Sequence, residues 1–263
     1  MKEIPKWSDL GPRLLSGVVI AVLGIGGVWM GGASYIAMVS LVTALLVWEI
    51  GRMTNPAQRV PAWQLGALAF GAMILTQVLP PVFVVPVTLA PALVGVGLLR
   101  RHRGLFFLYA LWVLLAGLGF FLLRVQGGVI WMLWLVLVVV ASDIAGYFVG
   151  KSLGGPKFWP RISPKKTWSG TLGGWALAGL VGAIFVLMGK AGPHLIWVSM
   201  VVAFAAQMGD IAESTLKRRM GIKDSSQLIP GHGGVFDRFD GMVGAAVLLL
   251  FMMAFNMLHL AAF

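Results

Sequence analysis

The sequence contains no cysteine and very little charge. The absence of cysteine excludes a disulfide framework, a thiolate nucleophile and a cysteine-ligated metal site. Charged residues make up 11% of the 263 residues, whereas soluble domains carry about 25%. Hydrophobic residues make up 59%, and the mean hydropathy is +0.91. These values exclude an ordinary soluble domain and predict an all-α fold, a polytopic transmembrane helical bundle.

Apolar stretches recur along the chain, and a stretch of about 20 residues is long enough to span a membrane as a helix. We predict nine spans, at roughly 13–30, 33–50, 63–79, 82–99, 105–123, 129–149, 171–189, 195–216 and 241–261. The break between the first two rests on Gly31 and Gly32 and is the weakest. No small-x-small cleavage site follows the first apolar run, so we expect it to be retained as a span rather than removed as a signal peptide.

The distribution of basic residues supports this count. If the N-terminus is cytoplasmic, 18 of the 20 Lys and Arg residues fall in cytoplasmic segments, leaving Arg124 and Lys190 on the other side. This asymmetry is the one expected of membrane proteins. The formal net charge of +11 is then explained by loops facing anionic lipid. We therefore expect membrane lipids, and no nucleic acid, as partners.

The two halves of the sequence differ in character. Residues 1–128 have short loops and read as membrane helices that form a scaffold, with possible oligomer contacts. Residues 129–263 contain two long cytoplasmic loops, 150–170 and 217–240, that are dense in Gly, Pro, Lys and Asp. Six of the nine acidic residues lie after residue 140. We expect the C-terminal half to be the catalytic region, with the two loops forming the site.

Three acidic residues lie within or at the ends of the expected membrane helices. Asp143, Asp210 and Glu213 would together cost roughly 8–10 kcal/mol at mid-membrane, so they must face a polar cavity, pair with cations or lie near the interface. Asp210, Glu213, Ser214 and Lys217 share one helix face by their spacing. Structural pairing at helix ends is the simpler alternative. A polar stripe of this kind otherwise predicts a cleft.

The loop 217–240 combines glycines, carboxylates and basic residues. Glycines around His232 permit a ligand to approach the backbone closely. Asp237 and Asp240 bracket Arg238, which suits a hard divalent cation beside a phosphate. This mixture is what phosphoryl or nucleotidyl transfer requires. A zinc site is not expected, because cysteine is absent and the four histidines are far apart in the chain.

The loop 150–170 is a second candidate for anion binding. Lys165 and Lys166 follow Ser163 and precede Thr167 and an expected helix. Such a pair before a helix N-terminus suits a phosphate. The glycine spacing is wrong for a Walker A loop. Taken alone, the lysine pair would more simply reflect topology and lipid-headgroup contact.

The spacing of Ser214, Lys217-Arg218, Lys223-Asp224, Pro230 to Gly234, Asp237-Arg238 and Asp240 resembles the signature of the phosphatidate cytidylyltransferase family, also called CDP-diacylglycerol synthases. The segments around Asp143 and 163–170 resemble the two upstream motifs of that family. Ile144 and Ser169 depart from its usual residues at their positions. Before about residue 140 the resemblance is one of hydropathy alone.

The resemblance implies a nucleotidyltransferase of phospholipid biosynthesis that converts CTP and phosphatidate to CDP-diacylglycerol and pyrophosphate. It implies a Mg²⁺ ion and leaves open a second cation. It also implies a homodimer in a bacterial cytoplasmic membrane, with the active site on the cytoplasmic side. The implied catalytic residues are Asp210, Asp237, Lys217, Arg218 and His232. The implied substrate-binding residues are Ser163, Lys165, Lys166, Thr167, Lys223, Arg238, Gly233 and Gly234. The implied metal ligands are Asp210 and Asp237, with Asp143, Glu213, Asp224 and Asp240 as second candidates.

Three other functions fit the sequence less well. An ion-coupled membrane transporter would use intramembrane acidic residues, but it predicts internal repeats, and none is visible. A CTP-dependent kinase of a lipid alcohol is disfavoured by the full signature. The Asp-Gly-x-x-Ala-Arg pattern of CDP-alcohol phosphotransferases is absent from the sequence.

Overall fold

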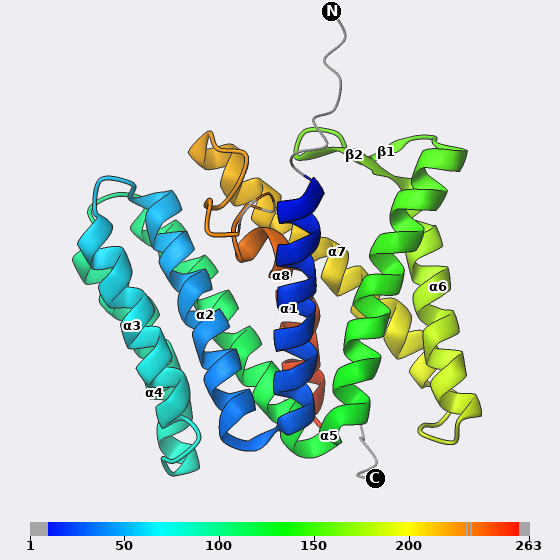
Figure 1. Cartoon of the computed structure of the whole chain (residues 1–263), viewed down its shortest axis with the longest axis horizontal. Helices are drawn as coiled ribbons and strands as arrows, with labels where there is room; N and C mark the ends of the chain where they lie inside the picture. Colours follow the sequence, from blue (N-terminus) through cyan, green and yellow to red (C-terminus); the bar gives the residue numbers. More distant parts are fainter. Residues whose placement is uncertain (1–9, 230, 232, 258–263) are drawn as a thin grey trace, which may run out of the picture. The chain divides into compact units, whose positions relative to one another are not determined.

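The structure is a computed structural model that describes residues 10–229, 231 and 233–257, with side chains from Leu15 onward. Long apolar segments form helices in this part of the chain, and one short hairpin interrupts them (Figure 1). In chain order the elements are α1 (Leu10–Met30), α2 (Gly32–Thr54), α3 (Arg59–Leu75), α4 (Pro81–Leu98), α5 (Arg103–Leu153), β1 (Lys157–Trp159), β2 (Ser163–Thr167), α6 (Trp168–Leu187), α7 (Leu195–Met220) and α8 (Phe236–Ala254).

The weakest predicted break, between the first two apolar segments, is confirmed. Helix α1 ends at Met30 and α2 begins at Gly32. Gly31 has φ 63° and Gly32 has φ 49°. Only glycine adopts such angles without a steric penalty, so two adjacent glycines allow the chain to turn between two helices.

Helix α5 contains the expected pair of helices at 105–123 and 129–149, joined at a kink. It runs as one 51-residue element with a break at Gly128, where φ is 69° and ψ is −161°. The two apolar segments and the break between them were located correctly, and the link between the helices is the single residue Gly128. A single glycine makes the break because it tolerates positive φ, while the residues on both sides remain helical.

The loop 150–170 contains a β-hairpin that the all-α prediction lacked. Strand β1 pairs antiparallel with β2, with Lys157 opposite Thr167 and Trp159 opposite Ser163. The strands are three and five residues long, and β2 contains Pro164. Strands this short carry little alternating pattern, and proline argues against a strand unless it lies at an edge. The fold is otherwise helical, as predicted.

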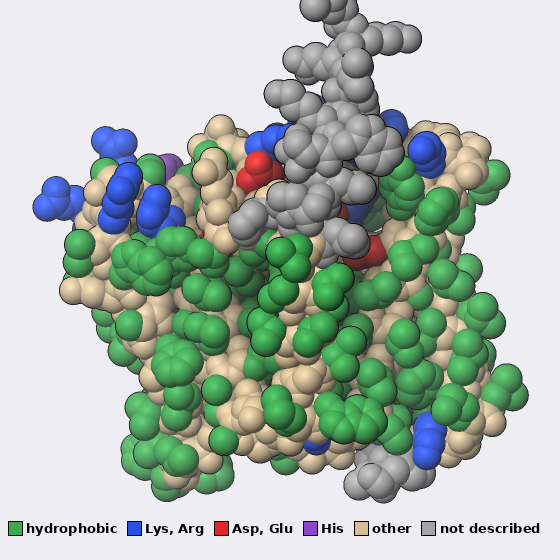
Figure 2. Space-filling model, viewed as in Figure 1, with side chains coloured by type: hydrophobic (Ala, Val, Ile, Leu, Met, Phe, Trp, Pro, Cys, Tyr) green, Lys and Arg blue, Asp and Glu red, His purple; other side chains and the backbone are tan. Residues whose placement is uncertain are grey.

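Among the residues that the structure describes, five helices, α2, α4, α5, α6 and α7, are long and apolar enough to cross a membrane by length and composition. Large hydrophobic side chains are exposed on their flanks, as Figure 2 shows for one face. On α6, for example, Leu172, Leu180 and Ile184 are 52%, 54% and 47% exposed. Apolar surface on this scale is typical of helices solvated by lipid. The coarse class, a membrane helical bundle, is therefore supported, and the count of nine spans stays a prediction.

The chain divides into two compact units that interleave in sequence. The first comprises residues 1–110 and 220–238, and the second comprises residues 111–219 and 239–263. In the first, α3 packs between α2 and α4 (Figure 1), around buried Ile50, Leu65 and Met73. In the second, Trp131 and Trp134 are buried, and Trp134 Nε1 donates to Ser199 Oγ over 2.9 Å. Packing thus groups residues 220–238 with the N-terminal helices, while the functional division expected at residue 128 stays a prediction.

Candidate active site

Three carboxylates lie together in the second unit. Asp210 and Glu213 project from α7 and Asp240 from the first turns of α8, and one oxygen of each lies within 4.8 Å of the others. Glu213 is buried, with 1% of its side chain exposed. Like charges at this separation repel strongly unless a cation or a proton is present. The cluster is therefore a candidate cation site.

Glycines allow the two helices to bring these carboxylates together. A Cβ added to Gly209 would meet the backbone carbonyl of Asp240 and would lie 3.2 Å from the Cα of Gly244. Backbone atoms cannot move aside as a side-chain tip can. The absence of a side chain at Gly209 thus sets the approach of α7 to α8, and with it the spacing of the cluster.

Two lysines balance part of the negative charge. Lys166 forms an ion pair with Asp210 and also donates to the backbone oxygen of Gln207 over 3.3 Å. Lys217 Nζ lies 2.6 Å from Glu213 Oε2, one helical turn away. The predicted common face of Asp210, Glu213 and Lys217 is confirmed by this pair and by the cluster. Cations beside carboxylates suit a site that handles both metal and phosphate.

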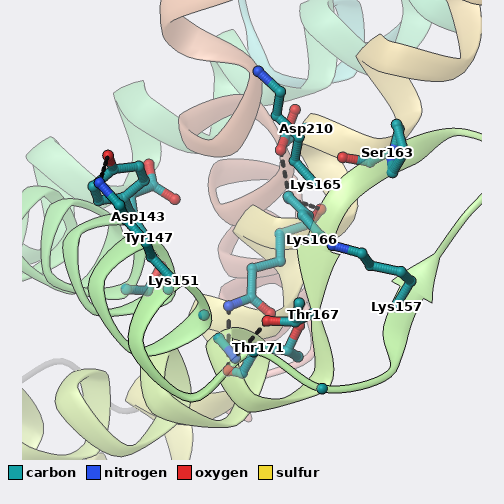
Figure 3. A pocket seen from close by; sticks show the side chains of 18 residues that line it. Asp143, Tyr147, Lys151, Lys157, Ser163, Lys165, Lys166, Thr167, Thr171 and Asp210 are labelled. Atoms are coloured by element: carbon teal, nitrogen blue, oxygen red, sulfur yellow. Dashed lines mark hydrogen bonds and ion pairs between the residues drawn. The ribbon is translucent and has the colours of Figure 1, made fainter.

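A pocket of about 600 Å³ adjoins Asp210. Its walls come from the C-terminal part of α5, the hairpin, the start of α6, and α7 (Figure 3). In that view Tyr147 and Lys151 lie on one side, Lys157 and Ser163 lie on the other, and the side chain of Lys166 lies between them. Four lysines line the pocket, namely Lys151, Lys157, Lys165 and Lys166. A cavity of this size with four cations suits a ligand that carries several phosphates.

The hairpin and α6 are held against α5 by local contacts. Thr167 precedes α6 and its hydroxyl accepts from Gly170 N over 3.2 Å, a normal N-cap. A Cβ on Gly170 would lie 2.5 Å from the backbone oxygen of Gly146, so α6 can approach α5 closely only with glycine there. The predicted substrate-binding residues Ser163, Lys165, Lys166 and Thr167 consequently share one pocket wall.

The first unit holds residues 220–238, the signature loop. Asp237 Oδ2 accepts hydrogen bonds from Ser225 N, Ser225 Oγ and Gly234 N, each over 2.8 Å. Gly233 has φ 82° and its backbone oxygen accepts from Ile229 N. The remaining predicted residues differ in burial: Gly234 is buried, whereas Lys223, Asp224 and Arg238 are exposed. His232 lies outside the described residues.

The second long loop is divided between the two units, because residues 220–238 belong to the first unit, whereas Lys217 and Asp240 lie in the second. Asp143, Lys165, Lys166 and Asp210 line the pocket of the second unit. Lys217 belongs with Glu213, and Arg218 is exposed on the last turn of α7. Glu213 and Asp240, both second candidates, join Asp210 in the cluster, and the roles of Asp237 and Asp224 stay predictions.

Sequence reasoning missed several polar residues. Glu49 on α2 is fully buried and accepts hydrogen bonds from the signature loop. Gln207 on α7 is buried, and its side chain accepts from Trp175 Nε1 over 3.0 Å. The signal was available for Glu49, because an ionisable side chain within an apolar segment is a functional candidate by default. The pocket also adds Tyr147, Lys151 and Lys157.

The sequence is similar to several proteins named phosphatidate cytidylyltransferase. A phosphatidate cytidylyltransferase of Brucella suis is 49% identical over 122 residues, which are 45% of this chain and 44% of that protein. The enzyme of the same name from Bacillus subtilis is 39% identical over 132 residues, 49% of each chain. That of Pseudomonas aeruginosa is 32% identical over 261 residues, 90% of this chain and 94% of that protein.

The first of these matches spans just under half the length of the relative, whereas the last spans nearly all of it. The model of the cytidylyltransferase family matches residues 12–256. This match includes both loops, all the residues of the carboxylate cluster and the pocket. The chain therefore belongs to the cytidylyltransferase family, as the signature in its second long loop predicted.

Proposed function

We propose that this protein transfers the cytidylyl group of CTP to phosphatidate, giving CDP-diacylglycerol and pyrophosphate. The observation that carries the proposal is the carboxylate cluster beside a pocket lined by four lysines, in a member of the cytidylyltransferase family. The relatives named phosphatidate cytidylyltransferase supply the lipid substrate. Family membership favours this enzyme over the ion-coupled transporter.

Bond changes in this reaction balance without water. A phosphate oxygen of phosphatidate attacks the α-phosphorus of CTP, the bond from that phosphorus to the bridging oxygen of the β-phosphate breaks, and pyrophosphate leaves. The attacking oxygen is already anionic, so the protein needs no strong general base. Catalysis then rests on holding two anionic substrates together and on neutralising charge as the bond breaks.

The pocket residues are suited to these tasks. Lys166, held between Asp210 and Gln207, is placed to neutralise a phosphate oxygen. Lys165 and Lys157, from the two strands of the hairpin, would hold the rest of the triphosphate or the lipid phosphate. In the first unit, Lys223 and Arg238 remain proposed phosphate-binding residues, as do Arg218 and Lys217 at the end of α7.

The residues present also fit a magnesium ion. Carboxylate oxygens are the hard ligands that Mg²⁺ prefers, and Asp210, Glu213 and Asp240 offer three of them within 4.8 Å. We propose that these residues hold the ion, which when bound would neutralise charge on the triphosphate. Asp143 lines the adjoining pocket and stays a second candidate with Asp224. Asp237 stays a proposed metal ligand on the family resemblance. A second cation stays a proposal on the same ground.

The function is tested by incubating the purified protein with phosphatidate, Mg²⁺ and labelled CTP, dCTP or UTP in separate reactions. We expect a lipid-linked cytidylate and pyrophosphate in equal amounts with CTP, and much less product with UTP. No lipid-linked product with any cytidine nucleotide would overturn the proposal. Solute flux in liposomes without CTP would instead favour a transporter.

We also propose nine spans with a cytoplasmic N-terminus and active site in a bacterial inner membrane. The break of α5 at Gly128 supports two spans within that element. Asn55 and Arg101 exchange two hydrogen bonds of 2.8 Å, so the α2–α3 and α4–α5 loops lie at one end of the first unit. The homodimer rests on the family resemblance, and light scattering of the purified protein tests it.

Because the chain lacks cysteine, single cysteines report topology cleanly. We expect Arg59→Cys to be protected from an impermeant maleimide in intact cells and labelled after lysis. Lys190→Cys, between α6 and α7, should be labelled in intact cells. Labelling of both or of neither in intact cells would contradict the proposed topology.

The approach of α7 to α8 gives a further prediction. We expect Gly209→Ala to lower kcat by about 10²-fold, because a displacement of roughly 1 Å at a catalytic group has an effect of that size. The added Cβ would meet the backbone of Asp240 and spread the carboxylate cluster. Initial rates with CTP and phosphatidate measure the effect. Gly71→Ala on α3 is the matched control, because its Cβ would meet no atom within 4 Å. Equal rates for the two variants would show that the close approach at Gly209 does not matter for catalysis.

A further inference from the structure

Glu49 on α2 is buried against the start of α8. Its side chain has 0% exposure, and its two carboxylate oxygens each accept two hydrogen bonds. Oε1 accepts from Val235 N over 2.8 Å and from Ser226 Oγ over 2.5 Å. Oε2 accepts from Phe236 N over 2.7 Å and from Ser225 Oγ over 3.1 Å. All these residues belong to the first unit.

Through these contacts the Glu49 side chain caps the N-terminus of α8, although α2 lies far from α8 in the sequence. The first N–H groups of a helix have no acceptor within the helix, and Val235 N and Phe236 N are at that end of α8. A capping side chain normally comes from the residue just before the helix. Val235, which occupies that place, has no polar side chain. The negative charge of Glu49 also interacts favourably with the helix dipole.

The same contacts reach Asp237. Ser225 donates its N–H and its hydroxyl to Asp237 Oδ2, each over 2.8 Å. The hydroxyl also lies in hydrogen-bond distance of Glu49 Oε2, and because it has a single proton the two carboxylates share it. A Cβ on Gly234 would meet both Ser225 Oγ and Glu49 Oε1. The orientation of Asp237 and the path of residues 225–226 and 234–236 thus depend on Glu49.

We propose that Glu49 is a positioning residue of the proposed cytidylyltransferase reaction. It holds the signature loop and the first turn of α8, and with them Asp237, in the geometry that the reaction uses, without itself touching substrate. The inference rests on the proposed function for its kinetic part only. Its structural part concerns the loop and can be tested without turnover.

The proposed role requires the negative charge of Glu49 as well as the shape of its side chain. Four donors converge on Glu49, and a carboxylate is acceptor-only. Glu49→Gln keeps the shape but turns an NH₂ group toward two of those donors. Glu49→Asp keeps the charge but withdraws it by one methylene. A residue needed only to fill space would tolerate the first change better than the second.

The experiment uses the full-length purified protein in detergent or nanodiscs. For Glu49→Gln we expect kcat to fall by about 10–100-fold, the range expected when one or two charge-assisted hydrogen bonds are lost, with a smaller change in KM for CTP. Glu49→Asp should recover part of the rate, and Ser226→Ala should lose less than Glu49→Gln. The control is Ser40→Ala, a buried residue of the same helix whose hydroxyl has no hydrogen-bond partner among the described residues.

Amide hydrogen exchange supplies a readout that does not depend on activity. In Glu49→Gln, peptides covering residues 225–238 should exchange at least about tenfold faster, as expected for local opening, while peptides of α3 and α6 stay at the wild-type rate. Unchanged exchange in residues 225–238 overturns the proposal, and so does a uniform increase across the chain. A wild-type protein that makes no lipid-linked cytidylate refutes the proposed function, and the exchange result still decides the role of Glu49.

Discussion

Asp210→Asn is expected to lower kcat by about 10²–10³-fold, the range found when one preorganised charged or polar group of an active site is removed. Asp210 is a member of the carboxylate cluster and also the ion-pair partner of Lys166. The substitution keeps the shape of the side chain and removes its charge. Lys166 then loses its partner, and the remaining carboxylates, Glu213 and Asp240, bind a divalent cation more weakly.

Initial rates of CDP-diacylglycerol formation at a series of Mg²⁺ concentrations measure this effect. We expect the half-saturating Mg²⁺ concentration to rise together with the fall in kcat. Thr215→Val on the same helix is the control, because its hydroxyl bonds to the backbone oxygen of Ile211 one turn away. A variant with normal Mg²⁺ dependence would remove Asp210 from the proposed cation site.

Lys166→Met is expected to lower kcat/KM for CTP by about 10²-fold, since loss of one electrostatic contact to a transferring phosphate has an effect of this size. The lysine lies in the pocket (Figure 3), pairs with Asp210 and donates to the backbone of Gln207. Methionine has a similar length and no charge. Lys151→Met, at a more exposed part of the pocket where the amine lies 3.4 Å from Tyr147 Oη, should lose only about a few-fold, as expected for a screened surface charge.

The double variant Asp210→Asn/Lys166→Met separates two explanations for that loss. If the lysine acts partly by fixing Asp210, the effects of the two substitutions will not add, as is usual for residues in direct contact. Additive losses would show that Lys166 acts on the substrate alone. A Lys166→Met variant with wild-type kcat/KM would exclude the pocket as the nucleotide site.

Much of the fold could be predicted from composition, because long apolar segments leave few alternatives to helices. The turn at Gly31 could be located for a local reason, since two adjacent glycines interrupt the apolar pattern. The hairpin could not, because three residues of β1 carry too little pattern and their pairing with β2 depends on the chain between them. The break within α5 was located, but the sequence did not show that Gly128 alone makes it, because a glycine pattern does not distinguish a sharp kink from a short loop.

The candidate site could likewise be predicted only where it depends on local spacing. Asp210, Glu213 and Lys217 could be placed on one face because helical spacing is a local property. The arrival of Asp240 beside them depends on how closely α7 and α8 pack at Gly209 and Gly244, which no local pattern records. Glu49 could be noticed as a lone acidic residue of α2, but its partners could not be named, since Ser225 lies 176 residues away.

That separation has a consequence for how the protein is made. Glu49 leaves the ribosome long before Ser225, and at roughly 5–20 residues per second the interval is about 10–35 s. Throughout that time α2 is already synthesised, and the Glu49 carboxylate has none of the four donors that satisfy it in the finished structure. The N-terminal helices therefore complete their packing only after the signature loop has been translated, so assembly of the first unit waits for a late part of synthesis.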